Sequence, residues 1–310
     1  MARLSLIDAL RIIGITFVII HHLQYNGGFT FFPWLYSDYI FPSPRAAFHL
    51  DIGSIGIWLF IFASGASLAL KSYNFSSLKN LGAFYASRLM RIYPIYWLAV
   101  LFSIITMPIS SPLTFSDYWR NFSGFQTFFI TDDSWQKLNS TFWFIGLIVS
   151  LYLLFPIVYV AIKRRPKISL TAFFIIYLVS TGVAWYYFPQ YAGMTDWFPL
   201  CQLFTFALGV YVIKQRLYLD FKSPSWLAAA GTLSFYLYLV HAAFLHYLPP
   251  IQFGYGFEWA MAWYFSVTII FGCVFYAFDC FLQKKLHILW FKIKVKFGQK
   301  AIQENWQLSK

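Results

Sequence analysis

Apolar stretches of about 20 residues recur along this 310-residue chain, and they limit its fold more than any other feature. About 20 consecutive apolar residues are what an α-helix needs to cross the hydrocarbon core of a bilayer. The stretches lie at about residues 4–25, 53–71, 92–110, 142–162, 168–188, 197–215, 225–247 and 259–283. The sequence therefore predicts an all-α, polytopic membrane bundle of about eight transmembrane helices, within a range of eight to ten.

The charged residues are few, and their distribution indicates a membrane orientation. Only 11% of the residues are charged, whereas soluble domains carry about 25%. If the N-terminus is cytoplasmic and the spans alternate in direction, Arg45, Arg120 and Lys137 fall outside and nearly all other Lys and Arg residues fall inside. This asymmetry follows the positive-inside rule and predicts a multi-pass plasma (inner) membrane protein with both termini in the cytoplasm. The net charge of +12 therefore indicates no nucleic-acid partner.

The chain divides into one expected membrane domain, residues 1–283, and a basic cytoplasmic tail, residues 284–310, that anionic membrane lipid would attract. Residues 26–52 and 111–141 are expected to be outer loops. The second loop is rich in aromatic residues, and it is open to interpretation as an interfacial helix, a re-entrant helix or a cap over a site. No metal site is expected, because the cysteines lie inside apolar stretches at no metal-like spacing. They are Cys201, Cys273 and Cys280.

Two ionisable residues share one face of the first apolar stretch. Arg11 and His22 are eleven residues apart, which places them on the same side of a helix and about 16 Å apart along its axis. Ionisable side chains inside a membrane helix are costly, so they indicate a functional site. Histidine titrates nearest neutral pH and suits a general base. His21 points about 100° away from His22 and is expected to contribute less.

Two further segments each have a structural and a functional interpretation. Gly53–Ser67 reads GSIGIWLFIFASGAS, whose small residues let helix backbones approach closely. Arg88 and Arg91 are three residues apart and are expected to share a helix face at the cytoplasmic side. The two arginines could simply set the membrane orientation, or they could clamp phosphate oxygens, which suit the planar guanidinium.

Two later segments also have a structural interpretation beside a functional one. Trp143–Pro156 reads WFIGLIVSLYLLFP and, taken alone, is typical of a packed helix. In Gly231–His241, Ser234 and His241 are seven residues apart and lie about 20° from one helix face. A lone membrane histidine often packs or forms an interhelical hydrogen bond, so His241 has that interpretation beside a functional one.

Taken in order, these segments resemble the acyltransferase-3 family of membrane-bound acyltransferases, which modify sugars and other envelope molecules. The matching patterns are Ile7–Arg11 followed by His22, Gly56–Gly65, Arg88–Pro94 and Ser234–His241. The resemblance runs from about residue 3 to 283. Within the family the form of the Trp143–Pro156 segment is similar to the O-acetyltransferase of enterobacterial common antigen, because Ile148 and Val149 stand where many members have Glu.

The resemblance implies an O-acyltransferase that moves an acyl group, expected to be acetyl, from acyl-CoA to a hydroxyl of a sugar or glycolipid acceptor. The residues expected to take part in catalysis are His22 as the base, Arg11 and Asp8. Those expected to bind the acetyl-CoA donor are Arg88, Arg91, Ser64 and Tyr93. Those expected to bind the acceptor are His241, Ser234, Trp143 and Tyr238. The alternative is a transporter or flippase of a lipid-linked or sugar substrate, in which Arg11 and His22 would line a substrate or proton path.

Overall fold

The computed structural model describes residues 4–27, 51–108, 112–129, 137–188, 194–218, 221–245 and 256–308. Over these ranges the chain forms helices and no strand, apart from a bridge between Leu4 and Lys222. The helices are α1 (Ser5–Gly27), α3 (Ile52–Ala69), α4 (Leu78–Thr106), α5 (Phe115–Ser123), α6 (Trp143–Arg164), α7 (Pro166–Tyr187), α8 (Met194–Trp197), α9 (Pro199–Lys214), α10 (Ser225–His241) and α12 (Phe257–Leu308). Short 3-10 helices are η2 (Gln126–Phe128), η4 (Ser140–Phe142) and η5 (Ala242–Phe244). The predicted all-α class is confirmed.

Among the described residues, seven helical segments are long and apolar enough to cross a membrane: α1, α3, α4, α6 with η4, α7, α10 with η5, and α12. The apolar helix α9 has 16 residues, or about 24 Å of helix, which is less than the roughly 30 Å of a bilayer core. Each predicted apolar stretch coincides with one of these helices. The predicted membrane bundle is therefore confirmed, and its sixth stretch forms a shorter helix than expected.

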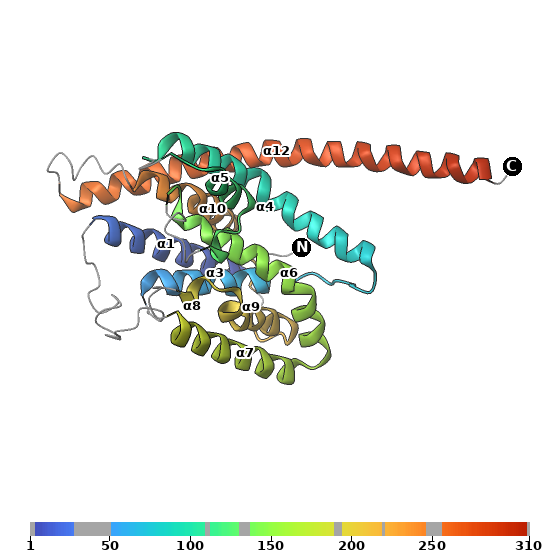
Figure 1. The fold of residues 1–310 in the computed structure, drawn as a ribbon, viewed down its shortest axis with the longest axis horizontal. Helices are drawn as coiled ribbons and strands as arrows, with labels where there is room; N and C mark the ends of the chain where they lie inside the picture. The colour runs from blue at the N-terminus through green and yellow to red at the C-terminus, as the bar shows by residue number, and fades with distance from the viewer. Residues whose placement is uncertain are drawn as a thin grey trace.

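Two helices extend well beyond their predicted stretches. α4 begins at Leu78 and not near residue 92, because the Ser77 hydroxyl caps it by accepting a hydrogen bond from the Asn80 backbone N–H at 3.2 Å. α12 continues through the basic segment after residue 283 without a break. In Figure 1 the last part of α12 projects past the rest of the bundle. Hydropathy does not reveal these extensions, because both are rich in polar residues.

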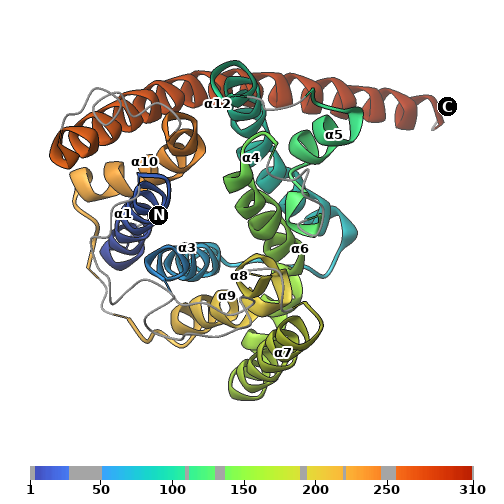
Figure 2. The same ribbon diagram turned by 60° about the vertical axis from the view of Figure 1, so that its left-hand side comes forward.

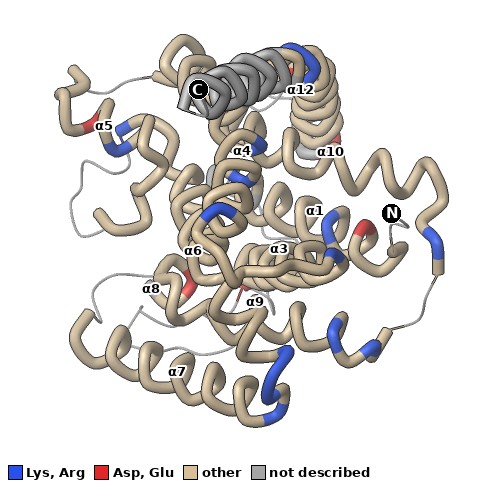
Figure 3. The backbone as a smooth tube through the Cα atoms, turned by 90° about the vertical axis from the view of Figure 1, so that its right-hand side faces the viewer, with Lys and Arg blue, Asp and Glu red and all other residues tan. Residues whose placement is uncertain are grey.

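Both ends of the chain lie towards one end of the bundle, which we call the basic end (Figure 1). The turn from α6 to α7, preceded by Lys163 and Arg164, lies at the same end. Figure 3 views the molecule from this end and shows blue Lys and Arg segments on several of its helices. The arrangement agrees with a cytoplasmic location for both termini, which stays a prediction. We call the opposite end, where α1 stops and α6 begins, the distal end.

Backbone contacts fix α3 between α1 and α9, which lie on either side of it in Figure 2. A Cβ atom on Gly56 of α3 would lie 2.7 Å from the Gly14 carbonyl oxygen of α1. A Cβ on Gly65 would collide with the backbone carbonyl of Phe206 in α9. Only glycine fits such close approaches. The packing interpretation of Gly53–Ser67 therefore holds for its glycines.

The aromatic segment after α4 contains α5, which has nine residues and is too short to cross a membrane. Thr114 and Asp117 form a capping box at its start. Burial raises the pKa of Asp117, but hydrogen bonds from Thr114 and Lys137 outweigh burial, so this pKa lies below its usual value. After α5 the chain turns at Gly124, whose φ of 73° favours glycine.

This segment is attached to the distal half of α4 by three aromatic side chains. Tyr93, Tyr96 and Trp97 donate hydrogen bonds to the backbone carbonyls of Ser123, Asn121 and Phe122, respectively. The described part of the predicted 111–141 loop therefore packs on the bundle and does not span the membrane. Residues 130–136, and residues 28–50 of the predicted first loop, lie outside the described residues.

Candidate active site

The distal ends of α1 and α10 bring two histidines together. The ring centroids of His22 and His241 are 5.1 Å apart. His22 also lines a small pocket formed by α1, α3, α10 and the start of α6. The other lining residues are Val18, Ile57, Phe60, Thr141, Trp143, Phe144 and Tyr238. Three residues predicted to bind the acceptor, Trp143, Tyr238 and His241, are thus gathered around the predicted base.

One hydrogen bond holds the ring of His241 and another holds its backbone. Nδ1 of His241 lies 2.6 Å from the backbone oxygen of Tyr238, and because a carbonyl only accepts, Nδ1 carries the hydrogen. The Tyr264 hydroxyl donates to the backbone oxygen of His241 at 3.1 Å. Nε2 of the buried His241 has no hydrogen-bond partner among the described residues. In the neutral ring Nε2 is therefore an available acceptor.

The ring of His21 also packs against this histidine pair, although its side chain was expected to point about 100° away from His22. Its ring is edge-on to that of His22, with centroids 5.1 Å apart. Its Nδ1 lies 3.5 Å from Oδ2 of Asp51, the buried residue that caps α3. A signal was available for Asp51, because an aspartate just before an apolar helical stretch is a helix-start pattern. No local pattern relates it to His21.

Arg11 and Asp8 lie towards the basic end, seven and ten residues before the pocket-lining Val18 in α1, and Arg11 is about three turns from His22. Nη2 of Arg11 donates to the Ser67 hydroxyl of α3 at 2.7 Å, and Nη1 lies 3.6 Å from Oδ1 of Asp8. The predicted shared face of Arg11 and His22 therefore lies along α3. Arg11 bonds to Ser67 near the C-terminal end of α3, and His22 shares the pocket with Ile57 and Phe60 nearer its start. Arg11 lies beside Ser67 and Asp8, whereas His22 lies in the pocket beside His241.

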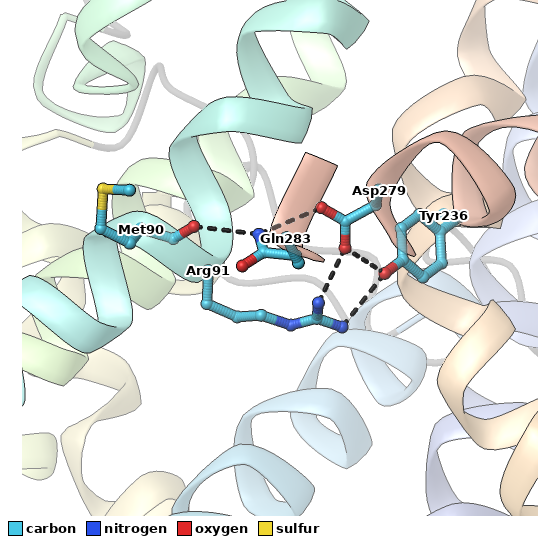
Figure 4. Close-up of polar contacts among 5 residues, drawn as sticks. All are labelled: Met90, Arg91, Tyr236, Asp279 and Gln283. Atoms are coloured by element: carbon cyan, nitrogen blue, oxygen red, sulfur yellow. Dashed lines mark hydrogen bonds and ion pairs between the residues drawn. The ribbon is translucent and has the colours of Figure 1, made fainter. Parts of the chain in front are cut away.

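Arg91 joins α4 to α10 and α12 (Figure 4). Nη1 donates to Oδ2 of Asp279 at 2.7 Å, and Nη2 donates to the Tyr236 hydroxyl at 3.0 Å. The Tyr236 hydroxyl donates to the same carboxylate oxygen at 2.6 Å. The Gln283 amide donates to Oδ1 of Asp279 and to the Met90 carbonyl, both at 3.1 Å. Asp279 is fully buried, so its charge depends on Arg91, whose own side chain is 47% exposed.

Arg88 has different neighbours from Arg91. The two arginines were expected to share a helix face, but their guanidinium groups contact different parts of the protein. Its guanidinium carbon lies 5.8 Å from the centre of the Phe84 ring, and its Nε donates to the Ser87 hydroxyl at 3.3 Å. Arg88 lines a shallow groove between α4 and α6. The residues that α6 contributes are Val149, Tyr152 and Leu153. Of the two arginines, Arg88 has no carboxylate contact among the described residues.

Three other predicted residues lie apart from these groups. The Tyr93 hydroxyl donates to the Ser123 carbonyl at 2.6 Å, so it faces the C-terminal end of α5. The buried Ser234 hydroxyl donates to Gly231 within its own helix at 2.9 Å. Ser64 is half-buried on α3, between the pocket-lining Phe60 and the Arg11 partner Ser67 in the sequence. Of the three, Ser64 is the one placed along the line from Arg11 to His22.

A family comparison decides the class of protein. The model of the acyltransferase-3 family, described as an acyltransferase domain, matches residues 4–222. The chain belongs to the acyltransferase-3 family. The comparisons with curated proteins and with solved structures gave no match. The match covers most of the predicted resemblance and makes the chain a multi-helix membrane acyltransferase.

The acyltransferase match includes α1 to α9 and ends before α10. Arg11, His22, Arg88 and Arg91 lie inside it, whereas His241 lies beyond it. The pocket nevertheless joins the two parts, because α10 packs on α1 and contributes Tyr238 and His241 beside His22. Over the described residues, no group of three or more His, Cys, Asp and Glu side chains could hold a metal ion.

Proposed function

We propose that this acyltransferase moves an acetyl group from acetyl-CoA to a hydroxyl of an envelope sugar or glycolipid, with His22 as general base. The observation that carries the proposal is the pocket at the distal end, where His22 lies 5.1 Å from His241, ring centroid to ring centroid, beside Trp143 and Tyr238. The pocket combines a titratable imidazole with aromatic walls, which suits a small polar acceptor group.

In the proposed reaction the acceptor hydroxyl oxygen attacks the thioester carbonyl carbon. The new C–O bond forms, the C–S bond breaks, and the hydroxyl proton passes to His22 and then to the CoA thiolate. His22 thus acts first as base and then as acid. Nε2 of His241, which has no hydrogen-bond partner among the described residues, is an acceptor for a second polar group of the same substrate.

The donor is proposed to enter from the basic end, where Arg88 and Arg91 lie on α4. Planar guanidinium groups suit the phosphates of CoA. The thioester arm would then follow α1 and α3 from Arg11 and Ser64 towards His22. Arg11 is suited to the negative charge that develops on the thioester oxygen or to polar groups of the arm.

The place of the reaction is proposed from the charge distribution. A cytoplasmic basic end puts acetyl-CoA within reach of Arg88 and puts the pocket at the outer face of the plasma membrane. Such a placement suits acceptors that are assembled in the envelope, as the likeness of Trp143–Pro156 to the enterobacterial common antigen O-acetyltransferase branch also suggests.

The test is acyl transfer by the purified protein in detergent. Envelope glycans and lipids from a deletion strain serve as acceptors with acetyl-CoA, while free thiol and acetylated product are measured together. Both should form with the wild type and with Gly82→Ala, a control whose Cβ meets no atom within 4 Å. Both should be lost in His22→Ala. Uptake of the acceptor without acetylation would contradict the proposal in favour of a transporter.

A further inference from the structure

We propose that Asp51 and His21 are positioning residues for His22: Asp51 holds His21 as a cation, and His21 in turn orients the His22 ring and keeps it unprotonated. The inference rests on the proposed role of His22 as the base. It concerns two residues that the sequence analysis did not place in the reaction.

Asp51 is held in place by a contact that does not involve the histidines. One carboxylate oxygen, Oδ1, accepts the Ser54 backbone N–H at 2.7 Å and so caps α3. The other oxygen, Oδ2, faces Nδ1 of His21 at 3.5 Å. Because Oδ1 is fixed by the helix start, Oδ2 has a defined direction towards His21. The carboxylate is buried, which strengthens its attraction for a cationic ring.

His21 is also confined by a glycine. A Cβ built on Gly53 would lie 2.6 Å from Cγ of the His21 ring. The ring therefore lies directly against the backbone at the start of α3, in space that any larger residue would fill. Asp51 and Gly53 together fix the orientation of His21, and the edge-on contact with centroids 5.1 Å apart transmits it to His22.

The charges of Asp51 and His21 affect whether the His22 ring is protonated. The titratable groups near His22 are His21 on α1, Asp51 before α3, and His241 and Tyr238 on α10. Asp196 of α8 is linked to this group through Ser54, whose hydroxyl donates a hydrogen bond to it at 2.6 Å. A cationic His21 lies edge-on against the His22 ring, and its charge opposes protonation of His22 more strongly than the Asp51 carboxylate favours it. An unprotonated ring is the form that can accept the acceptor's proton.

Asp51→Asn separates this role from a structural one. Asparagine caps helices about as well as aspartate, so the contact with the Ser54 N–H is kept while the charge is removed. His21→Gln is the second variant. The matched control is Asp117→Asn, which also changes a buried capping aspartate, but in α5.

The first readout does not require acyl transfer. Diethyl pyrocarbonate modifies unprotonated imidazole, and peptide mass spectrometry reports modification at His22 itself. In Asp51→Asn and His21→Gln the rate at His22 should fall about threefold or more near pH 6 and stay nearly unchanged near pH 8. Asp117→Asn should match the wild type at both pH values. Equal rates at pH 6 in all four folded proteins, or a faster rate in Asp51→Asn, would overturn the inference.

The second readout is acetyl transfer. Both variants should lower kcat about tenfold near pH 6, with the donor KM unchanged and partial recovery near pH 8. A loss of kcat that is the same at both pH values would reduce Asp51 and His21 to structural residues. If the wild type modified as expected but transferred no acetyl group, the proposed function would fail while the modification result would still decide the positioning role.

Discussion

Arg91 and Asp279 form an ion pair at 2.7 Å between residues that are 188 positions apart in the sequence. The pair lies where α4, α10 and α12 meet, and the carboxylate side is fully buried (Figure 4). Arg91 belongs to the motif that the sequence analysis assigned to the donor. The structure gives the same guanidinium a partner within the protein, so stability and donor binding have to be measured separately for this residue.

The first prediction compares two arginine substitutions. Arg91→Ala should lower Tm clearly, because it leaves the buried Asp279 without its cation, and a lost charge-assisted contact is worth about 1.5–3 kcal/mol. Arg88→Ala should leave Tm nearly unchanged, yet raise the KM for acetyl-CoA about tenfold. Thermal unfolding in detergent and donor titrations check both. An unchanged donor KM in both variants would leave Arg91 with its structural ion pair alone and make Arg88 a topology determinant only.

The second prediction concerns the base. His22→Ala should reduce turnover by about 10²–10⁴, the usual contribution of general acid–base catalysis, with donor binding kept. His21→Ala should cost less, since it removes a positioning residue and leaves the base. Steady-state kinetics near pH 7 on folded protein check the order. Equal losses from the two variants, or near-normal turnover in His22→Ala, would move the base elsewhere, with His241 as the next candidate.

The third prediction uses the close helix contacts. Gly65→Ala should lower Tm strongly, because its Cβ would collide with the Phe206 carbonyl, which cannot move without shifting α9. Gly82→Ala meets open space within α4 and should be neutral or stabilising, by up to about 1 kcal/mol from helix propensity. Thermal unfolding curves of the two variants should show changes in Tm that differ in sign or in size. Similar effects would mean that α3 and α9 are further apart than described.

The fourth prediction concerns orientation. A reporter fused after Lys310 should be active in the cytoplasm, and a cysteine introduced near Gly27 in a background without native cysteines should react with an impermeant reagent from outside. External labelling of a cysteine at the C-terminus would refute the orientation on which the donor's entry side depends.

The sequence alone could predict the helices and three residues of the pocket, His22, Trp143 and Tyr238, because these depend on local patterns. Apolar length located the spans, and helical spacing placed Arg11 and His22 on one face. The start of α4 could not be found by hydropathy, since Ser77 and the polar turn after it carry no apolar signal. Contacts between distant segments, such as Arg91 with Asp279 and His21 with Asp51, depend on how the helices pack, which no spacing along the chain encodes.

The glycine contacts of α3 divide the bundle into a stiff part and a compliant part. Where backbones touch, neither helix can rotate or slide without a collision, so α1, α3 and α9 behave as a single block. α4 contacts α10 and α12 through side chains: Arg91 bonds to Tyr236 and Asp279, and the Phe102 ring packs on Phe271 and Phe275. A polyanion that competes with Asp279 for the Arg91 guanidinium would therefore remove the polar contact of α4 with α10 and α12, keep the aromatic one, and leave the block that carries His22 in place.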